Sequence, residues 1–222
     1  MKQVRNWEAN TDFVGLVYSI MKINGKTQLM GDKVILVPYK KSHVKKYHEW
    51  MQSPRLQELT ASEPLSEEEE YEMQKSWYED DNKCTFIILD KKCFEETRSE
   101  EQSMIGDTNL YLSNDEEKTI AEGEIMIAET AFVGKKRGWE AMLLMFRYGV
   151  EFLGIAKYQV KIGLSNTPSI CMFKKMNFNT VSESKVFNEI TMESEVNETW
   201  KTWLTESTKQ FSVLPHTNED LE

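Results

Sequence analysis

Hydrophobic and polar positions along this chain follow two different periods, and each period predicts one kind of element. Short runs of branched and aromatic residues bounded by turn residues predict strands, whereas apolar residues spaced three and four apart predict amphipathic helices. Strands are expected at residues 33–39, 84–90, 104–112, 120–128 and 158–163, with a final hairpin over 180–195. Helices are expected after Ser42, after Ser66, from Gly138 to about Leu153, after Asn166 and around Trp200, Trp203 and Leu204.

The order of these elements predicts the fold class. Antiparallel strands come first and a strand–helix–strand–helix segment follows, which is typical of an α/β domain with a mixed central sheet flanked by helices. Ligands of such sheets bind beyond the carboxyl ends of strands, where the sheet changes direction. Residues 1–28 show little periodicity, residues 91–103 read as an exposed charged loop, and the polar residues 206–222 are expected to form a fraying tail.

Composition narrows the class of protein. A chain of 222 residues with 40% hydrophobic and 29% charged residues is typical of one soluble globular domain. The formal net charge of −10 argues against a nucleic-acid partner, and no run reaches membrane-spanning length. The three cysteines, Cys84, Cys93 and Cys171, match neither a disulfide framework nor a zinc site, so we expect a reducing, cytoplasmic location.

Several side chains that can do chemistry have plainer interpretations. Ser66 and Glu69 form a capping box, so the acidic run that follows is expected to be a solvated helix start rather than a metal cluster. His43 and His48 are five residues apart and face different sides of their helix, which indicates ordinary surface or half-buried histidines. Cys84 and Cys171 lie in apolar surroundings and are expected to be buried thiols, and we predict no metal site.

The segment from residue 123 to residue 141 carries the strongest chemical signal. A strand over 123–129 leads into a loop that contains Gly134, three cations and Gly138, and an amphipathic helix follows. The free backbone N–H groups and the positive dipole end of such a helix attract an anion, and the cations Lys135, Lys136 and Arg137 strengthen that field. The spacing matches neither a P-loop nor a dinucleotide fingerprint, so the loop predicts another carrier of pyrophosphate. A tight turn with a solvated basic loop is the alternative.

This loop resembles the coenzyme loop of the GNAT superfamily of acetyl-CoA-dependent N-acetyltransferases, whose pattern is Arg/Gln-x-x-Gly-x-Gly/Ala. Val133 takes the Arg/Gln position, Lys136 the first glycine and Gly138 the second. A second segment, with Asn166, Ser169, Phe173, Lys175 and Asn177-Phe178, resembles the superfamily's Asn-x-x-Ser-x-x-x-Tyr/Phe-x-Lys-x-Gly-Phe helix. The resemblance implies a mixed sheet split between its fourth and fifth core strands, with acetyl-CoA bound at the split.

Residues 21 to about 204 resemble the N-acetyltransferase 9 branch of this superfamily. The matching stretches include residues 34–39, 47–51, 59–65, 83–87, 126–129 and 161–163. The branch begins close to Met21, so we expect residues 1–20 to be an N-terminal extension or the product of an upstream start. On this division residues 21–205 form the acetyltransferase domain.

The resemblance also implies roles for individual residues. Backbone groups of Ile125, Met126 and Ile127 would bind the pantetheine arm, and one N–H would polarise the thioester, a donor typically worth about 2.7–4 kcal/mol. The remaining coenzyme contacts implied are Val133, Gly134, Lys135, Lys136, Arg137, Gly138, Asn166, Ser169 and Phe173. Glu124 first and Glu122 second are the expected proton acceptors, because they share one face of their strand at the place where the family keeps such acids.

The expected reaction is transfer of an acetyl group from acetyl-CoA to an amine on a protein or peptide. Three departures from the family pattern favour an alternative, a GNAT-fold binding protein of weak or no activity. Val133 lacks a polar side chain, Lys136 brings a Cβ where a glycine is usual, and Phe173 lacks the hydroxyl that protonates the departing thiolate in many relatives. A third alternative, acetylation of small amines such as polyamines, is compatible with the acidic chain.

Overall fold

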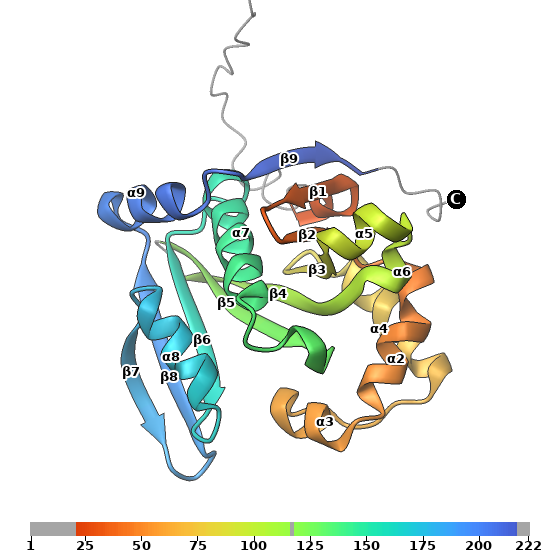
Figure 1. Ribbon diagram of the computed structural model, residues 1–222. Helices are drawn as coiled ribbons and strands as arrows, with labels where there is room; N and C mark the ends of the chain where they lie inside the picture. Colours follow the sequence, from red (N-terminus) through yellow and green to blue (C-terminus); the bar gives the residue numbers. More distant parts are fainter. Residues whose placement is uncertain (1–20, 116–117, 217–222) are drawn as a thin grey trace, which may run out of the picture.

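The computed structural model describes residues 21–115 and 118–216, and their strands form one nine-stranded sheet (Figure 1). The strands are β1 (Thr27–Met30), β2 (Val34–Pro38), β3 (Lys83–Asp90), β4 (Met104–Asp115), β5 (Lys118–Ile127), β6 (Lys157–Gly163), β7 (Asn179–Ser184), β8 (Glu189–Glu195) and β9 (Ser212–Pro215). Their order across the sheet is β7-β8-β6-β5-β4-β3-β2-β1-β9. Only the β5–β6 pair is parallel, which makes the sheet mixed as predicted.

Helices cover both faces of the sheet. They are α2 (Val44–Met51), α3 (Pro54–Thr60), α4 (Glu67–Glu79), α5 (Lys91–Thr97), α6 (Glu100–Ser103), α7 (Arg137–Phe152), α8 (Thr167–Lys175) and α9 (Glu198–Ser207), with short 3-10 turns at Met21–Lys26, Lys41–His43 and Thr130–Phe132. Helix α7 packs with α8 and α9 on one face, and α2 and α4 cover the other. Strand β3 is buried along its whole length, which is why its sequence is almost continuously apolar rather than alternating.

The predicted split lies between β5 and β6. The two strands pair only from Ile120↔Lys157 to Glu122↔Gln159, although β5 continues to Ile127 and β6 to Gly163. Beyond Glu122, the β6-facing backbone groups of β5 therefore open onto the space between the strands. When the strands are counted in chain order from β2, β5 and β6 are the fourth and fifth.

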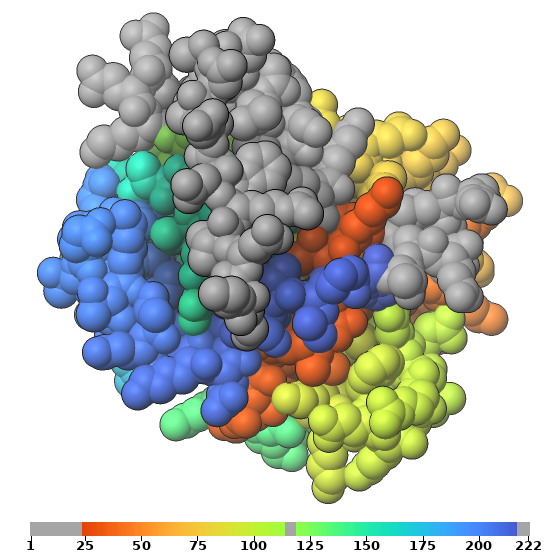
Figure 2. All heavy atoms as spheres, turned by 90° about the horizontal axis from the view of Figure 1, so that it is seen from above, coloured from red at the N-terminus to blue at the C-terminus, as the bar shows by residue number. Residues whose placement is uncertain are grey.

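The edge of the sheet differs from the prediction. Residues 27–30 form β1, and Ser212–Pro215 form β9, which pairs antiparallel with β1 rather than fraying. Figure 2 shows the blue C-terminal segment lying against the red N-terminal strands. Both strands have only four residues, too few to show a period, so the pairing of two distant segments is not visible in the pattern. The sheet therefore includes residues beyond position 205, where the sequence analysis ends the acetyltransferase domain. Residues 1–20 lie outside the described part.

The charged excursion at 91–103 is helical rather than a loop. Asp90 caps α5 by accepting from the Cys93 N–H at 3.0 Å, and Ser99 caps α6 in the same way through Gln102. These caps nucleate two short helices with almost no apolar face, so the hydrophobic pattern does not report them.

Among residues 21–115 and 118–216, none of the helices combines the length and the hydropathy that a membrane span requires.

His43 also differs from the prediction, because it is fully buried rather than at the surface. Its Nε2 donates to Glu100 at 2.9 Å, and the Nε2 of His216 lies 2.9 Å from the other carboxylate oxygen. The Lys40 ammonium adds an ion pair at 2.8 Å. Burial disfavours the carboxylate, but the hydrogen bonds outweigh it and hold the pKa of Glu100 well below its usual range. This cluster fastens α6 to both the start of α2 and the end of β9.

Candidate active site

A cleft of about 740 Å³ opens at the split between β5 and β6. Its floor is the end of β5, from Ile125 to Ile127, and its walls come from α3 on one side and α8 on the other (Figure 1). The basic glycine loop and the first turn of α7 close one end. The walls are mostly apolar, which suits a long ligand that carries a flexible arm and a few polar groups.

The loop leaves the N-terminus of α7 uncapped by a side chain. Gly134 has φ +74° and Lys136 has φ 64°, so both residues occupy the left-handed region that glycine favours. Lys136 is the N-cap residue of α7, and its side chain makes no capping hydrogen bond, in contrast to Ser66 in α4 or Asn166 in α8. The first N–H groups of a 16-residue helix thus remain available to an anion at the mouth of the cleft.

Gly138 has a different function from Gly134. A Cβ at Gly138 would lie 3.3 Å from the side chain of Ile127 and 3.4 Å from that of Ile125. The missing side chain therefore lets the first turn of α7 pack closely on the floor of the cleft. The family pattern places its second small residue at this contact.

Most of the predicted coenzyme residues gather around this cleft. Those that line it are Met126, Ile127, Val133, Gly134, Lys136, Gly138, Asn166 and Ser169. Asn166 has a structural task as well, because its side chain accepts from the Ser169 N–H at 3.3 Å and caps α8. Val133 is 47% exposed at the rim, and Lys135 is exposed on the loop.

Two of the predicted residues point elsewhere. The guanidinium of Arg137 donates twice to Asp90 Oδ2, at 3.0 and 2.9 Å, and so ties the start of α7 to the end of β3. Phe173 is 2% exposed and packs against Phe146 and Phe178 in the core. Sequence spacing placed both on the right elements, but the side-chain direction depends on partners far away in the chain.

Glu122 and Glu124 lie side by side on the α2/α4 face of β5, and their surroundings differ. Glu122 is ion-paired with Lys161 of β6 at 2.6 Å, and this hydrogen bond raises the pKa of Lys161. The Glu124 side chain is exposed in part, yet the partial burial of its carboxylate disfavours the charged form and raises its pKa. Lys83 and a hydrogen bond with Tyr111 act in the opposite direction. Glu124 is therefore the stronger candidate for a base near neutral pH.

Sequence reasoning missed three contributions to the cleft. Arg55, Leu56, Leu59 and Thr60 of α3 line it, although the pattern gives this short helix no marked face. Lys175 adds a cation from α8. Cys171, expected to be buried, is exposed and lines the cleft, because it sits on the side of α8 opposite the core residue Phe173.

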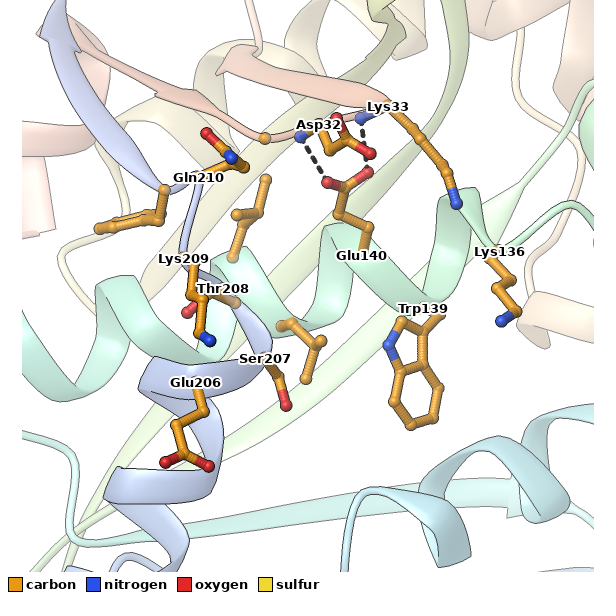
Figure 3. Close-up of a pocket in the computed structure, with 14 residues that line it drawn as sticks. Asp32, Lys33, Lys136, Trp139, Glu140, Glu206, Ser207, Thr208, Lys209 and Gln210 are labelled. Carbon is orange, nitrogen blue, oxygen red and sulfur yellow. Dashed lines mark hydrogen bonds between the residues drawn. The ribbon is translucent and has the colours of Figure 1, made fainter.

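A second hollow of about 380 Å³ lies behind the loop (Figure 3). Figure 3 shows Glu140, in the first turn of α7, reaching the β1–β2 turn, where it accepts from the N–H groups of Asp32 at 2.5 Å and Lys33 at 2.8 Å. Lys136 and Trp139 border both hollows. Glu140 thus ties the first turn of α7, which follows the glycine loop, to the β1–β2 turn.

The split sheet and the uncapped loop define the class of protein. Residues 33–179 match the family model described as an acetyltransferase (GNAT) domain. The chain belongs to the GNAT family of acetyltransferases. A solved structure of spermidine N-acetyltransferase from Vibrio cholerae, in complex with CoA and spermine, has a TM-score of 0.60 at 15% identity, covers 78% of this chain and 96% of its own, and shows the common fold.

Within the family the chain groups with N-acetyltransferase 9 and its relatives. It is 48% identical over 205 residues to the human alpha/beta-tubulin-N-acetyltransferase 9, which covers 91% of this chain and 99% of the human protein. The Drosophila melanogaster protein of the same name is 46% identical, covering 83% of this chain and 94% of its own. The chain is therefore an N-acetyltransferase enzyme.

Proposed function

We propose that this enzyme transfers an acetyl group from acetyl-CoA to an amine of a protein in the cytoplasm. The observation that carries the proposal is the coincidence of two features at one cleft. The uncapped N-terminus of α7, preceded by a loop that carries Lys135 and Lys136 and has left-handed backbone at Gly134 and Lys136, suits a pyrophosphate. The unpaired end of β5 beside it suits an extended, amide-bearing arm.

The residues present fit that ligand. The backbone of 134–138 and the charge of Lys136 would hold the phosphates, and the β6-facing edge of β5 from Ile125 to Ile127 would hold the arm. Bound there, acetyl-CoA supplies an activated acetyl thioester. The protein supplies apolar walls, among them Ile125, Leu56 and Met172, which exclude water from the split.

Glu124 is proposed as the general base. An amine attacks only when it is neutral, so its ammonium proton must pass to an acceptor within reach, directly or through one water. The raised pKa of Glu124 brings the carboxylate closer to the pH of the cell, where a base is most effective. Glu122, committed to Lys161, is proposed as a second carboxylate that attracts the cationic acceptor.

A protein acceptor is favoured by the relatives, because the human, mouse and Drosophila proteins are named for tubulin. Purified α/β-tubulin is therefore the first acceptor to test. Spermidine is the matched small-amine arm, since a polyamine acetyltransferase shares the fold. Acetylation of spermidine but not of tubulin would replace the protein acceptor by a small amine.

The first experiment is thermal unfolding with saturating acetyl-CoA and with ADP as the control. At about 100 times Kd a ligand of the folded state adds roughly 2.7 kcal/mol, which for a chain of this size raises Tm by about 5–10 °C. Glu124→Gln is expected to keep this shift and to lose about 10²–10⁴-fold in acetyl transfer. If ADP gives the same rise in Tm, acetyl-CoA as the specific donor is contradicted. If Glu124→Gln is fully active, Glu124 as the general base is contradicted.

A further inference from the structure

The α2/α4 face of the sheet carries a group of polar side chains next to the apolar cluster of that face. Lys83 of β3 stands opposite Tyr111 of β4, and Tyr111 stands opposite Glu122 of β5. In the next row Asn109 stands opposite Glu124. Thr85 of β3 and Asp107 of β4 on the same face are also buried and polar, whereas Ile87 and Leu89 of β3 are buried and apolar. Burying a polar group lowers the stability of the folded protein unless the group is hydrogen-bonded, so the partners of these side chains indicate what the group does.

A continuous hydrogen-bonded chain links this group to Glu124. The Lys83 ammonium, only 4% exposed, donates to the Tyr111 hydroxyl oxygen at 2.7 Å. Because an ammonium only donates, the hydroxyl must accept from it, and its own hydrogen is free for a second partner. The Glu124 carboxylate is the partner that the register offers, because Glu124 is the diagonal neighbour of Tyr111 on the same face of the sheet, and hydrogen bonding with Tyr111 is one of the causes that lower the pKa of Glu124.

Aromatic rings fix the lysine in this position. The Lys83 Nζ lies 2.9 Å from the centre of the Trp77 ring of α4, and 4.5 Å from that of Tyr111. Tyr47 packs edge-on against Trp77 with ring centres 6.2 Å apart. A cation held against the face of an aromatic ring is stabilised by the ring's negative charge distribution and has few other positions to adopt.

We propose that Lys83 and Tyr111 are positioning residues for the base: the Lys83 ammonium orients the Tyr111 hydroxyl, which donates to Glu124 and holds it as an ionised carboxylate at the start of the split. The inference rests on the proposed function, because it assigns the pair to Glu124 as the base. Neither residue touches the reacting groups. Each acts through the carboxylate.

The charged groups around Lys83, Tyr111 and Glu124 support the proposed stabilisation of the ionised Glu124 carboxylate. The ionisable groups that face Lys83 or Glu124 from the packed elements are Asp80 at the end of α4, Asp107 and Tyr111 of β4, Glu122 of β5 and Lys161 of β6. Burial lowers the pKa of Lys83 to about 7, so it is an ammonium through the range in which a carboxylate titrates. Burial raises the pKa of Glu124, while Lys83 and the Tyr111 hydrogen bond lower it. Removing either partner must therefore raise it further.

The test is a direct titration of Glu124 in the full chain. Protein labelled with ¹³C at the glutamate carboxyl carbon is titrated by NMR, and the Glu124 signal is the one that Glu124→Gln removes. We expect Lys83→Met to raise the titration midpoint of Glu124 by about 1 pH unit, the low end for loss of a close opposite charge, and Tyr111→Phe to raise it in the same direction through loss of a hydrogen bond to the carboxylate. Lys161→Met is the matched control, because its ion pair is with Glu122, and it is expected to shift the midpoint by less than half as much.

An unchanged Glu124 midpoint in Tyr111→Phe and Lys83→Met would overturn the inference. If Lys83→Met fails to fold, Tyr111→Phe decides alone, since it removes one oxygen and keeps the ring. The titration needs no acceptor, so it is independent of the acetyl-transfer assay. If Glu124→Gln is fully active, the proposed base is refuted, whatever the titration shows. If Glu124→Gln is inactive but the Glu124 midpoint is the same in wild type, Tyr111→Phe and Lys83→Met, only the role of Lys83 and Tyr111 is refuted.

Discussion

Lys136 combines a strained backbone with a positive charge at the mouth of the cleft, and comparing its glycine and alanine variants separates the two effects. Its φ of 64° is one that a residue with a Cβ adopts at a cost of about 1–2 kcal/mol. Lys136→Gly removes this cost but adds about 0.5–1 kcal/mol of chain entropy lost on folding. The net gain is about 0.5–1 kcal/mol, which corresponds to a rise in Tm of about 2 °C for a chain of this length.

The same substitution removes a cation from the mouth of the cleft. An ion pair between exposed charges is worth about 0.2–1 kcal/mol, so loss of the Lys136 ammonium is expected to weaken acetyl-CoA binding by up to about fivefold. Lys136→Ala is the matched control, because it loses the charge but keeps the strained backbone. Both variants are expected to bind acetyl-CoA more weakly in calorimetry, and only the glycine variant is expected to melt higher.

Gly134→Ala tests the backbone part alone. A Cβ there meets nothing within 4 Å, so the change brings no clash, only a positive φ of 74°. Its cost of about 1–2 kcal/mol is partly offset by a stiffer unfolded chain, about 0.4–1 kcal/mol. We expect Tm to fall by about 2 °C. The reasoning is refuted if Lys136→Gly melts below wild type, or if Gly134→Ala melts above it.

Three further predictions concern the frame of the site. Gly106→Ala places a Cβ against the carbonyl oxygen of Met126, so we expect the free energy of unfolding to fall by about 1–3 kcal/mol. We also expect acetyl-CoA to raise the Tm of this variant by less than it raises that of wild type, and an unchanged melting curve would contradict the prediction. Because the pKa of Glu100 is depressed in the folded protein, the stabilisation by its carboxylate is present above the unfolded pKa of about 4.3 and is lost as the pH falls toward the folded value. Glu100→Gln is expected to remove that part of the acid dependence of the free energy of unfolding. If denaturant titrations give wild type and variant the same dependence of this free energy on pH, the argument is wrong. Cys171 is expected to react with iodoacetamide and to be protected by acetyl-CoA, with buried Cys84 as the unreactive internal control; labelling that acetyl-CoA leaves unchanged would place the ligand elsewhere.

The donor side of the site is readable from sequence because it is contiguous. A strand, a glycine loop and a helix start follow one another from residue 123 to residue 141, so composition and spacing alone indicate an anion site at Gly134–Gly138. The split between β5 and β6 comes with the family resemblance. Spacing does not reveal a side chain that is paired with a distant residue. Arg137 belongs by spacing to the phosphate loop, but in the structure its guanidinium donates to Asp90, 47 positions away.

The acceptor side has no such local signature, because it is assembled across strands. Lys83 and Tyr111 are 28 positions apart and meet only because the β3–β4 register sets them opposite each other. A shift of that register by one residue would turn Lys83 to the α7 face, and no base would gain a partner. From sequence, Lys83 is simply the first residue of an apolar strand, where a lysine is usually a solvated end. Its burial against Trp77 depends on α4 covering that end of β3. The partners of the proposed base are therefore set by the topology of the sheet, whereas the residues proposed to hold acetyl-CoA follow one another along the chain.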